Sequence, residues 1–327
     1  MKWSCAALLA PLLLAVALAA ETWKWQLPPG MPEPFVPADN PMSEAKRALG
    51  QRLFLEPKLS VTGGMACADC HESAKAFTDG RPRAPGATGE LTDRGAMSLV
   101  NVAYSQSLGW VKPELRPLEA QMLEPLFNEH PLEMGLRGRE QAVAALLQSR
   151  SDYRAQFRAA FPGEAQPVTM PNIIKAIACY ERTLIFAGSL FDRYLYRGEH
   201  AALTPAARRG MDLYFSAEVG CARCHSGINL AGPWRDASGA TGPRALADNG
   251  LGGGKFKVPT LRNIALTAPY MHDGRFAGLD AVLRHYGQIA QHRGRDQRLP
   301  VRELTAGEQR ELRAFLESLT DPAFNKP

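Results

Sequence analysis

The sequence predicts a mostly α-helical protein built from two similar domains, and three observations lead to this prediction. Apolar residues recur at helical spacing in several segments, whereas no segment alternates strongly between apolar and polar residues as a half-buried strand does. The pattern Gly-x-x-Leu-aromatic occurs twice, over residues 50–54 and 210–214. Each copy precedes a Cys-x-x-Cys-His sequence, so each half of the chain combines a helix with such a loop.

The two Cys-x-x-Cys-His sequences, at residues 67–71 and 221–225, have the spacing that attaches a c-type heme. Two thiols add to the vinyl groups of one porphyrin, and the adjacent histidine becomes the proximal iron ligand. Zinc and disulfide sites also use Cys-x-x-Cys, but a zinc site needs further ligands, and no other Cys or His lies near either sequence. The predicted fold is therefore two cytochrome c-like domains, each enclosing one covalently attached heme c. The heme-binding residues are Cys67, Cys70, His71, Cys221, Cys224 and His225.

Helical periodicity predicts several helices, and two of them carry capping signals. Asn40 followed by Pro41 has the character of a helix start, and Thr305-x-x-Glu308 is a capping box. The predicted helices cover residues 41–53, 139–160, 171–187, 205–216 and 304–319.

The first 19 residues have the features of a secretory signal peptide. Lys2 precedes an apolar run that ends in a small-x-small cleavage sequence, and this run is too short for a membrane span. We therefore expect a periplasmic protein with no membrane span after the signal is removed. The expected division is a signal peptide at 1–19, a proline-rich extended lead-in at 20–40, an N-terminal heme domain at 41–187, a hinge at 188–203 and a C-terminal heme domain at 204–327.

The composition is that of a globular protein and does not indicate nucleic-acid binding. The 327 residues are enough for two domains, and 45% of them are hydrophobic. The net charge of +5 is only mildly basic, which fits a solvated surface or an acidic protein partner. Cys179 lies in an apolar helical pattern and is expected to be a buried thiol.

Three stretches resemble the diheme cytochrome c peroxidase and MauG superfamily: residues 258–274 (VPTLRNIALTAPYMHDG), 92–110 (TDRGAMSLVNVAYSQSLGW) and 129–135 (EHPLEMG). The first is highly specific to that group, and the other two look most like the MauG- and MbnH-like branch. The resemblance covers nearly all of the expected mature chain. It implies a heme peroxidase-type oxidoreductase, in which the N-terminal heme is peroxidatic and the C-terminal heme stores or relays an electron.

The resemblance also implies three catalytic residues. Glu133 matches the distal glutamate that moves a proton between the two oxygens of hydrogen peroxide, and Gln121 matches a distal glutamine that orients the peroxide. The spacing between them is longer by two residues than in the cytochrome c peroxidases, so Glu129 is the alternative proton carrier. Gln121 is otherwise a helix-surface amide. Trp110 matches the tryptophan between the hemes and is otherwise an ordinary core residue.

The remaining iron ligands follow from the same resemblance. Related peroxidases that need reductive activation carry a loop histidine after the first heme sequence, but residues 72–129 contain none. We therefore expect an open first iron, with His130 as the nearest competitor. At the second iron, Tyr286 stands where peroxidases have methionine and MauG-like enzymes have tyrosine, and a phenolate lowers the reduction potential. Met271 and His285 are the alternative ligands.

A calcium ion commonly lies between the hemes in this family, and carbonyls at Thr267 and Pro269 fit its site. Gly95, however, stands where the family has an asparagine ligand. Glycine offers no side-chain oxygen, although a water molecule can complete the flexible oxygen shell of Ca²⁺. Calcium binding therefore stays open.

The combined expectation is a periplasmic diheme enzyme that uses hydrogen peroxide to form a high-valent two-heme state and then oxidises an aromatic residue, expected to be tryptophan, on a partner protein. The first alternative is a diheme cytochrome c peroxidase that takes electrons from a small cytochrome c or a copper protein. Tyr286 and the missing loop histidine argue against it. The second alternative is a plain electron-transfer cytochrome, which has no need of the acid–base pair Gln121 and Glu133.

Overall fold

The described part of the protein is mostly helical, as the sequence predicts. A computed structural model describes residues 23–232, 235–236, 248, 250–252, 254–289 and 302–325. The predicted signal peptide lies outside these residues. Within them, the β-strands are one antiparallel pair of two-residue strands, and no helix has the length and apolar character needed to cross a membrane.

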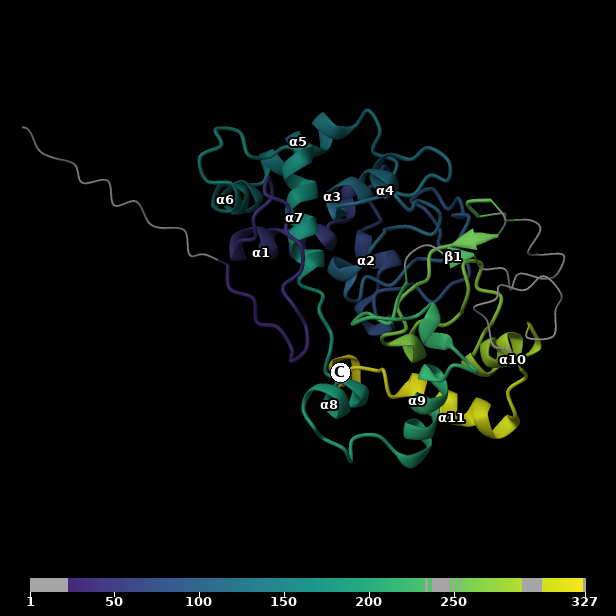
Figure 1. Ribbon diagram of the computed structural model, residues 1–327. Coiled ribbons are helices and arrows are strands. Elements are labelled where there is room, and N and C mark those ends of the chain that lie inside the picture. Colours follow the sequence, from purple (N-terminus) through teal and green to yellow (C-terminus); the bar gives the residue numbers. More distant parts are fainter. Residues whose placement is uncertain are drawn as a thin grey trace, which may run out of the picture.

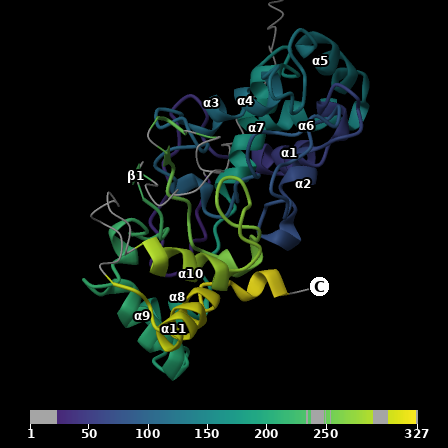
Figure 2. The ribbon, with the colours of Figure 1, turned by 90° about the vertical axis from the view of Figure 1, so that its right-hand side faces the viewer.

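The helices lie in two groups, which are separated in both views of the ribbon (Figures 1 and 2). The first group comprises α1 (Glu44–Phe54), α2 (Cys67–Cys70), α3 (Leu118–Gln121), α4 (Leu123–Phe127), α5 (Glu140–Ser149), α6 (Ser151–Ala160) and α7 (Met170–Arg182). The second comprises α8 (Leu190–Tyr196), α9 (Pro205–Phe215), α10 (Leu279–Ile289) and α11 (Ala306–Glu317). The strands are β1 (Arg235–Asp236) and β2 (Lys255–Phe256). Short 3-10 helices lie at Pro57–Leu59, Ser73–Lys75, Val102–Tyr104, Cys221–Arg223, Ile264–Leu266 and Pro322–Asn325.

Helix α1 crosses α7 at a glycine, and this crossing organises the first core. A Cβ atom on Gly50 would stand 1.9 Å from the carbonyl oxygen of Ala176 on α7. The backbones therefore approach so closely that only glycine fits. On either side of the crossing, Leu49 and Leu53 are fully buried in the first core.

Helix α9 crosses α11 in the same way and organises the second core. A Cβ atom on Gly210 would stand 1.9 Å from the carbonyl oxygen of Glu311. One turn further along, the ring of Tyr214 packs 5.1 Å from that of Phe315, and both are buried. The repeated pattern Gly-x-x-Leu-aromatic thus marks the same helix crossing in both halves of the chain.

Two of the predicted helices are confirmed to within two residues, as α9 and α11, whereas α1 begins three residues later than predicted. The capping box of α11 is also confirmed, because Thr305 and Glu308 exchange hydrogen bonds between side chain and backbone. The predicted helix start at Asn40 is wrong. Ser43 caps α1 instead, and the buried amide of Asn40 donates a hydrogen bond to Glu119.

Two predicted helices have different bounds in the structure. The segment 139–160 forms two helices, because Arg150 takes an extended conformation (ψ 119°) between α5 and α6. The segment 171–187 ends earlier, as α7, because Asn101 binds the chain beyond it. The N–H of Asn101 donates to the carbonyl of Leu184 (2.8 Å), and its side-chain oxygen accepts from the N–H of Phe186 (2.7 Å).

The two groups of helices meet across an aromatic cluster. Phe77 and Phe186 pack around Phe324, which lies near the C-terminus, and the ring centroids of Phe186 and Phe324 are 4.5 Å apart. Residues 188–203, the predicted hinge, contain helix α8, and its Phe191 is buried in the second core. Aromatic packing therefore ties the end of the chain to the first half.

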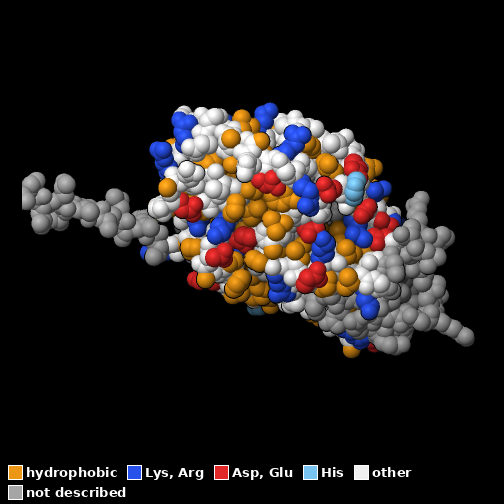
Figure 3. Space-filling model, turned by 90° about the horizontal axis from the view of Figure 1, so that it is seen from above, with side chains coloured by type: hydrophobic (Ala, Val, Ile, Leu, Met, Phe, Trp, Pro, Cys, Tyr) orange, Lys and Arg blue, Asp and Glu red, His pale blue; other side chains and the backbone are white. Residues whose placement is uncertain are grey.

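The surface carries charges of both signs. On the face seen from above, basic and acidic side chains surround apolar areas (Figure 3). Neither sign dominates this face, in keeping with the small net charge of +5.

Replacing Gly210 by alanine should destabilise the second core. The added methyl group would overlap the carbonyl of Glu311, and such overpacking costs about 1–3 kcal/mol. Denaturant unfolding measures the loss. The matched control is Gly307→Ala, at an open position near the start of α11, which should be neutral or stabilise by up to about 1 kcal/mol. Equal stabilities of the Gly210→Ala variant and the wild type would contradict the role of the crossing.

Candidate heme and peroxide site

The first Cys-x-x-Cys-His sequence forms the short helix α2 and the residue after it. Nδ1 of His71 is 3.0 Å from the carbonyl oxygen of Phe77, and the ring of His71 lies 6.4 Å from that of Phe54, at the end of α1. Burial lowers the pKa of His71 and raises the pKa of the Cys67 and Cys70 thiols to about 12. The imidazole is therefore neutral, and α1 supports it through Phe54.

The second Cys-x-x-Cys-His sequence is arranged in the same way. Nδ1 of His225 is 3.1 Å from the carbonyl oxygen of Pro259, and burial lowers the pKa of the imidazole to about 4. The hydroxyl of Tyr214, on α9, donates a hydrogen bond to the backbone carbonyl of His225. Tyr214 and Phe54 hold the same position in the repeated pattern, so an aromatic residue from the glycine-containing helix supports each histidine.

Both histidines are prepared to coordinate a metal through Nε2. A histidine ligand directs its other ring nitrogen to a carbonyl or carboxylate, which sets the tautomer and the orientation of the ring. His71 and His225 both make this contact. Beside His225 lies a cavity with mostly apolar walls, which Cys221, Cys224 and Tyr286 also line. Two thiols, a neutral imidazole and apolar walls fit a covalently attached heme.

Glu133 is half-buried near the first heme sequence. Burial, with a smaller contribution from repulsion by Glu124, raises the pKa of Glu133 to about 7. Its charge in turn contributes to the raised pKa of the Cys70 thiol, which places the two groups near each other. The backbone carbonyl of Glu133 accepts a hydrogen bond from the N–H of Ala87 at 2.7 Å. A carboxyl group that titrates near neutral pH can both accept and return a proton.

The alternatives to Glu133 are more exposed. The Glu129 side chain is 67% exposed, and its carboxylate lies 3.6 Å from the guanidinium of Arg137. His130 is exposed as well. Gln121, the last residue of α3, is half-buried. Of the two candidate carboxylates, Glu133 is the one that is half-buried.

The glycine-rich loop of residues 78–95 packs directly on the segment that carries Glu133. A Cβ atom on Gly86 would stand 1.8 Å from the carbonyl oxygen of Leu132. The same loop reaches the first heme sequence, where the carbonyl of Pro85 lies 3.9 Å from the sulfur of Cys70. The loop thus connects Cys70 of the first heme sequence with the candidate acid–base residue.

Tyr286 and both alternative ligands line the cavity beside His225. Tyr286, on α10, is half-buried, and burial raises the pKa of its phenol to about 12. Met271 and His285 line the same cavity, and the rings of His285 and Tyr286 are 5.8 Å apart. A phenol with such a high pKa ionises at neutral pH only when a bound cation compensates the charge. The fold therefore brings all three candidate ligands to one place.

Trp110 lies where the two halves of the chain meet. It belongs to the first half but lines the cavity of the second heme sequence. Its indole Nε1 donates to the carbonyl of Gly95 at 2.8 Å, and its own carbonyl accepts from the N–H of Lys257 at 3.0 Å. These two hydrogen bonds hold the indole in the cavity wall.

The candidate calcium residues lie near the same junction. The N–H of Gly95 donates to the carbonyl of His272 at 3.0 Å, three residues beyond Pro269. The hydroxyl of Thr267 donates to the carbonyl of Ile264 at 3.2 Å. Within the described ranges, no three His, Cys, Asp or Glu side chains form a metal-binding group.

Lys257 lines the cavity beside His225, although its place in this site was not predicted from the sequence. It is only 8% exposed. Burial, with a smaller contribution from Arg116, lowers the pKa of Lys257 to about 8. Its place between Phe256 and Val258 is the only sign in the sequence that this lysine is buried. A buried ammonium group favours an anionic partner in the cavity.

The chain matches known proteins over most of its length. A family model described as di-haem cytochrome c peroxidase matches residues 44–201. The methylamine utilization protein MauG of Methylorubrum extorquens is 33% identical, over 94% of this chain and 86% of its own. The cytochrome c551 peroxidase of Pseudomonas aeruginosa is 33% identical, over 74% and 72%. The crystal structure of a MauG-like protein associated with microbial copper homeostasis has a TM-score of 0.85 at 37% identity, covering 93% of this chain and 97% of the other.

The relatives include both MauG proteins and cytochrome c peroxidases. The di-haem description of the matching family agrees with the two heme sequences described above. This chain belongs to the di-haem cytochrome c peroxidase family and is a heme peroxidase-type oxidoreductase.

Proposed function

We propose that this protein is an exported diheme enzyme that uses hydrogen peroxide to oxidise an aromatic residue, specifically tryptophan, on a partner protein. Two c-type hemes, attached covalently in two domains through the Cys-x-x-Cys-His sequences, supply the redox chemistry when bound. Export to the periplasm follows from the predicted signal peptide at residues 1–19.

The observation that carries this proposal is the position of Tyr286. It lines the cavity that also contains His225 and both cysteines of the second heme sequence. A tyrosinate is a hard anionic donor, which favours oxidised over reduced iron and so lowers the reduction potential. Such a ligand suits an enzyme that holds oxidising equivalents for a protein substrate. It suits less well an enzyme that relays electrons from a cytochrome.

Glu133 is the proposed proton carrier. Its carboxylate takes the proton from one peroxide oxygen and returns it to the other, so that the departing oxygen leaves as water. A pKa near 7 makes both transfers accessible at neutral pH. Gln121, half-buried at the end of α3, orients the peroxide through its amide.

Trp110 is the proposed intermediate position for an electron that passes between the two halves. Its indole is held by Gly95 in the first half, while its carbonyl binds Lys257 in the second. An oxidisable side chain fixed at this junction divides the transfer between the two halves into two shorter steps.

A cytochrome c peroxidase activity is the second candidate, and Met271 favours it. Met271 lines the same cavity as His225, and methionine ligation raises the potential of a heme. With Met271 rather than Tyr286 as ligand, the second heme would accept electrons from a small cytochrome c or a copper protein.

Replacing Glu133 by glutamine should slow the reaction with peroxide by about a hundredfold or more, because the amide cannot carry a proton. Both hemes and the fold should be retained, since the side chains are nearly isosteric. In the wild type, the rate should rise with pH around 7, because only the ionised carboxylate accepts the first proton. This rise should disappear in the variant, as measured by stopped-flow absorbance. Glu129→Gln, at an exposed position, is the control, and a slow control beside a normal Glu133→Gln would transfer the role to Glu129.

Replacing Tyr286 by phenylalanine should remove the low-spin ferric signature of the second heme while both hemes stay attached. Phenylalanine keeps the ring that lines the cavity but has no oxygen to donate. Electron paramagnetic resonance of the ferric protein measures the change. Met271→Leu is the matched comparison. A spectrum altered by Met271→Leu and not by Tyr286→Phe would favour the peroxidase activity.

Peroxide added to the oxidised protein should lead to oxidation of an aromatic residue on a neighbouring exported protein. A reduced small cytochrome c should react more slowly, because a tyrosinate ligand disfavours reduction of the second heme. Mass spectrometry of the partner and a stopped-flow comparison of the two donors measure these outcomes. Fast turnover with the cytochrome, and no mass change on the partner, would identify a cytochrome c peroxidase.

A further inference from the structure

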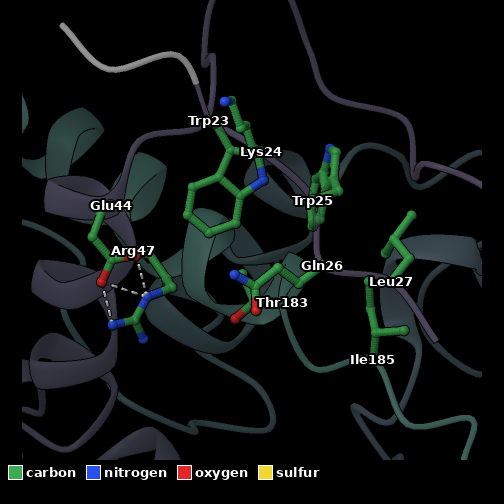
Figure 4. Close-up of a pocket in the computed structure, with 9 residues that line it drawn as sticks. All are labelled: Trp23, Lys24, Trp25, Gln26, Leu27, Glu44, Arg47, Thr183 and Ile185. Carbon is green, nitrogen blue, oxygen red and sulfur yellow. Dashed lines mark hydrogen bonds and ion pairs between the residues drawn. The ribbon is translucent and has the colours of Figure 1, made fainter.

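Trp23 and Trp25 frame an open cavity that the proposed function does not use (Figure 4). The cavity has a volume of about 590 Å³ and is also lined by Leu27, Arg47 and Ile185. The two indole rings meet edge to face, with centroids 5.4 Å apart. The site therefore offers aromatic and aliphatic surface to a ligand of small size.

Among the described residues that line this cavity, one buried polar atom has no hydrogen-bond partner. The indole Nε1 of Trp23 is buried and makes no hydrogen bond, and in Figure 4 it lies on the side of the ring that faces Trp25. The guanidinium of Arg47 is already occupied by Glu44 and Gln51. A ligand oxygen that accepts the Trp23 N–H would satisfy the unpaired donor.

An aromatic route leads from the cavity to the first heme sequence. Thr183, in the cavity wall, donates a hydrogen bond to the carbonyl of Tyr180 at 2.7 Å. The charge of Arg47, also in the wall, acts on the phenol of Tyr180. The ring of Tyr180 lies 5.3 Å from that of Phe54, which in turn lies 6.4 Å from the ring of His71.

We propose that this cavity binds small phenols, which deliver electrons to the first heme through Tyr180 and Phe54. The inference rests on the peroxide reaction proposed above. Each phenol loses one electron to the route and one proton to solvent and becomes a phenoxyl radical. Two phenols thus supply the two electrons and two protons that convert one hydrogen peroxide into two water molecules. The indoles pack against the phenol ring, and its oxygen accepts from the N–H of Trp23.

Binding is tested with 4-methoxyphenol by calorimetry, in the absence of peroxide. Trp23→Phe keeps an aromatic ring but removes the donor, so it should weaken binding by about three- to tenfold. Tyr194→Phe, on α8, is the matched control, because the ring of Tyr194 contacts His200 and does not line the cavity. Unchanged affinity in Trp23→Phe would overturn the proposed site.

The route is tested by peroxide-dependent oxidation of 4-methoxyphenol. Tyr180→Phe should lower the rate several-fold and leave the affinity unchanged, whereas Tyr194→Phe should leave both unchanged. Oxidation of the partner protein should persist in Tyr180→Phe, while Glu133→Gln should slow both reactions. The failure of the phenol site is thereby distinguished from the failure of the proposed function. Phenol oxidation at the wild-type rate in Tyr180→Phe would overturn the route.

Discussion

Two helix crossings, each closed by a glycine, set the positions of the groups around both heme sequences. At Gly50 and Gly210 the backbone of one helix lies against a carbonyl of its partner, with no room for a side chain. One turn later, Phe54 packs near His71, and Tyr214 hydrogen-bonds to the backbone of His225. The same arrangement therefore occurs in both halves. A histidine that is to coordinate a metal needs a rigid neighbour if its ring is to keep one orientation.

Burial gives the two halves different chemistry from similar frameworks. It makes both histidines poor bases and so leaves them neutral for coordination. In the first half it also raises the pKa of Glu133 to about 7. In the second half burial raises the pKa of the Tyr286 phenol and lowers the pKa of the Lys257 ammonium group. A carboxyl group with a pKa near 7 therefore lies beside one heme sequence, and a phenol and an ammonium group lie beside the other.

The junction between the halves links these two environments. The N–H of Gly95 donates to the carbonyl of His272, and the carbonyl of Gly95 accepts from the indole N–H of Trp110. Gly95 offers no side-chain ligand for calcium, but its backbone links the two halves of the chain. Within the first half, Trp23 and Tyr180 belong to the proposed route from the cavity to the first heme sequence. Electrons from the partner protein and electrons from a phenol would accordingly reach the hemes by different routes.

The two heme sequences and the helix that precedes each of them could be identified from the sequence, because both depend on residues that lie close together in the chain. Covalent heme attachment depends on the spacing of adjacent residues, and the repeat containing Gly50 and Gly210 marks a contact made within each half. The break at Arg150 was not predicted, and neither was the early end of α7, which depends on the distant Asn101. The burial of Lys257 and the contrast between Glu133 and Glu129 also required the folded chain. A pKa depends on what surrounds a group in space, and only tertiary packing sets those surroundings.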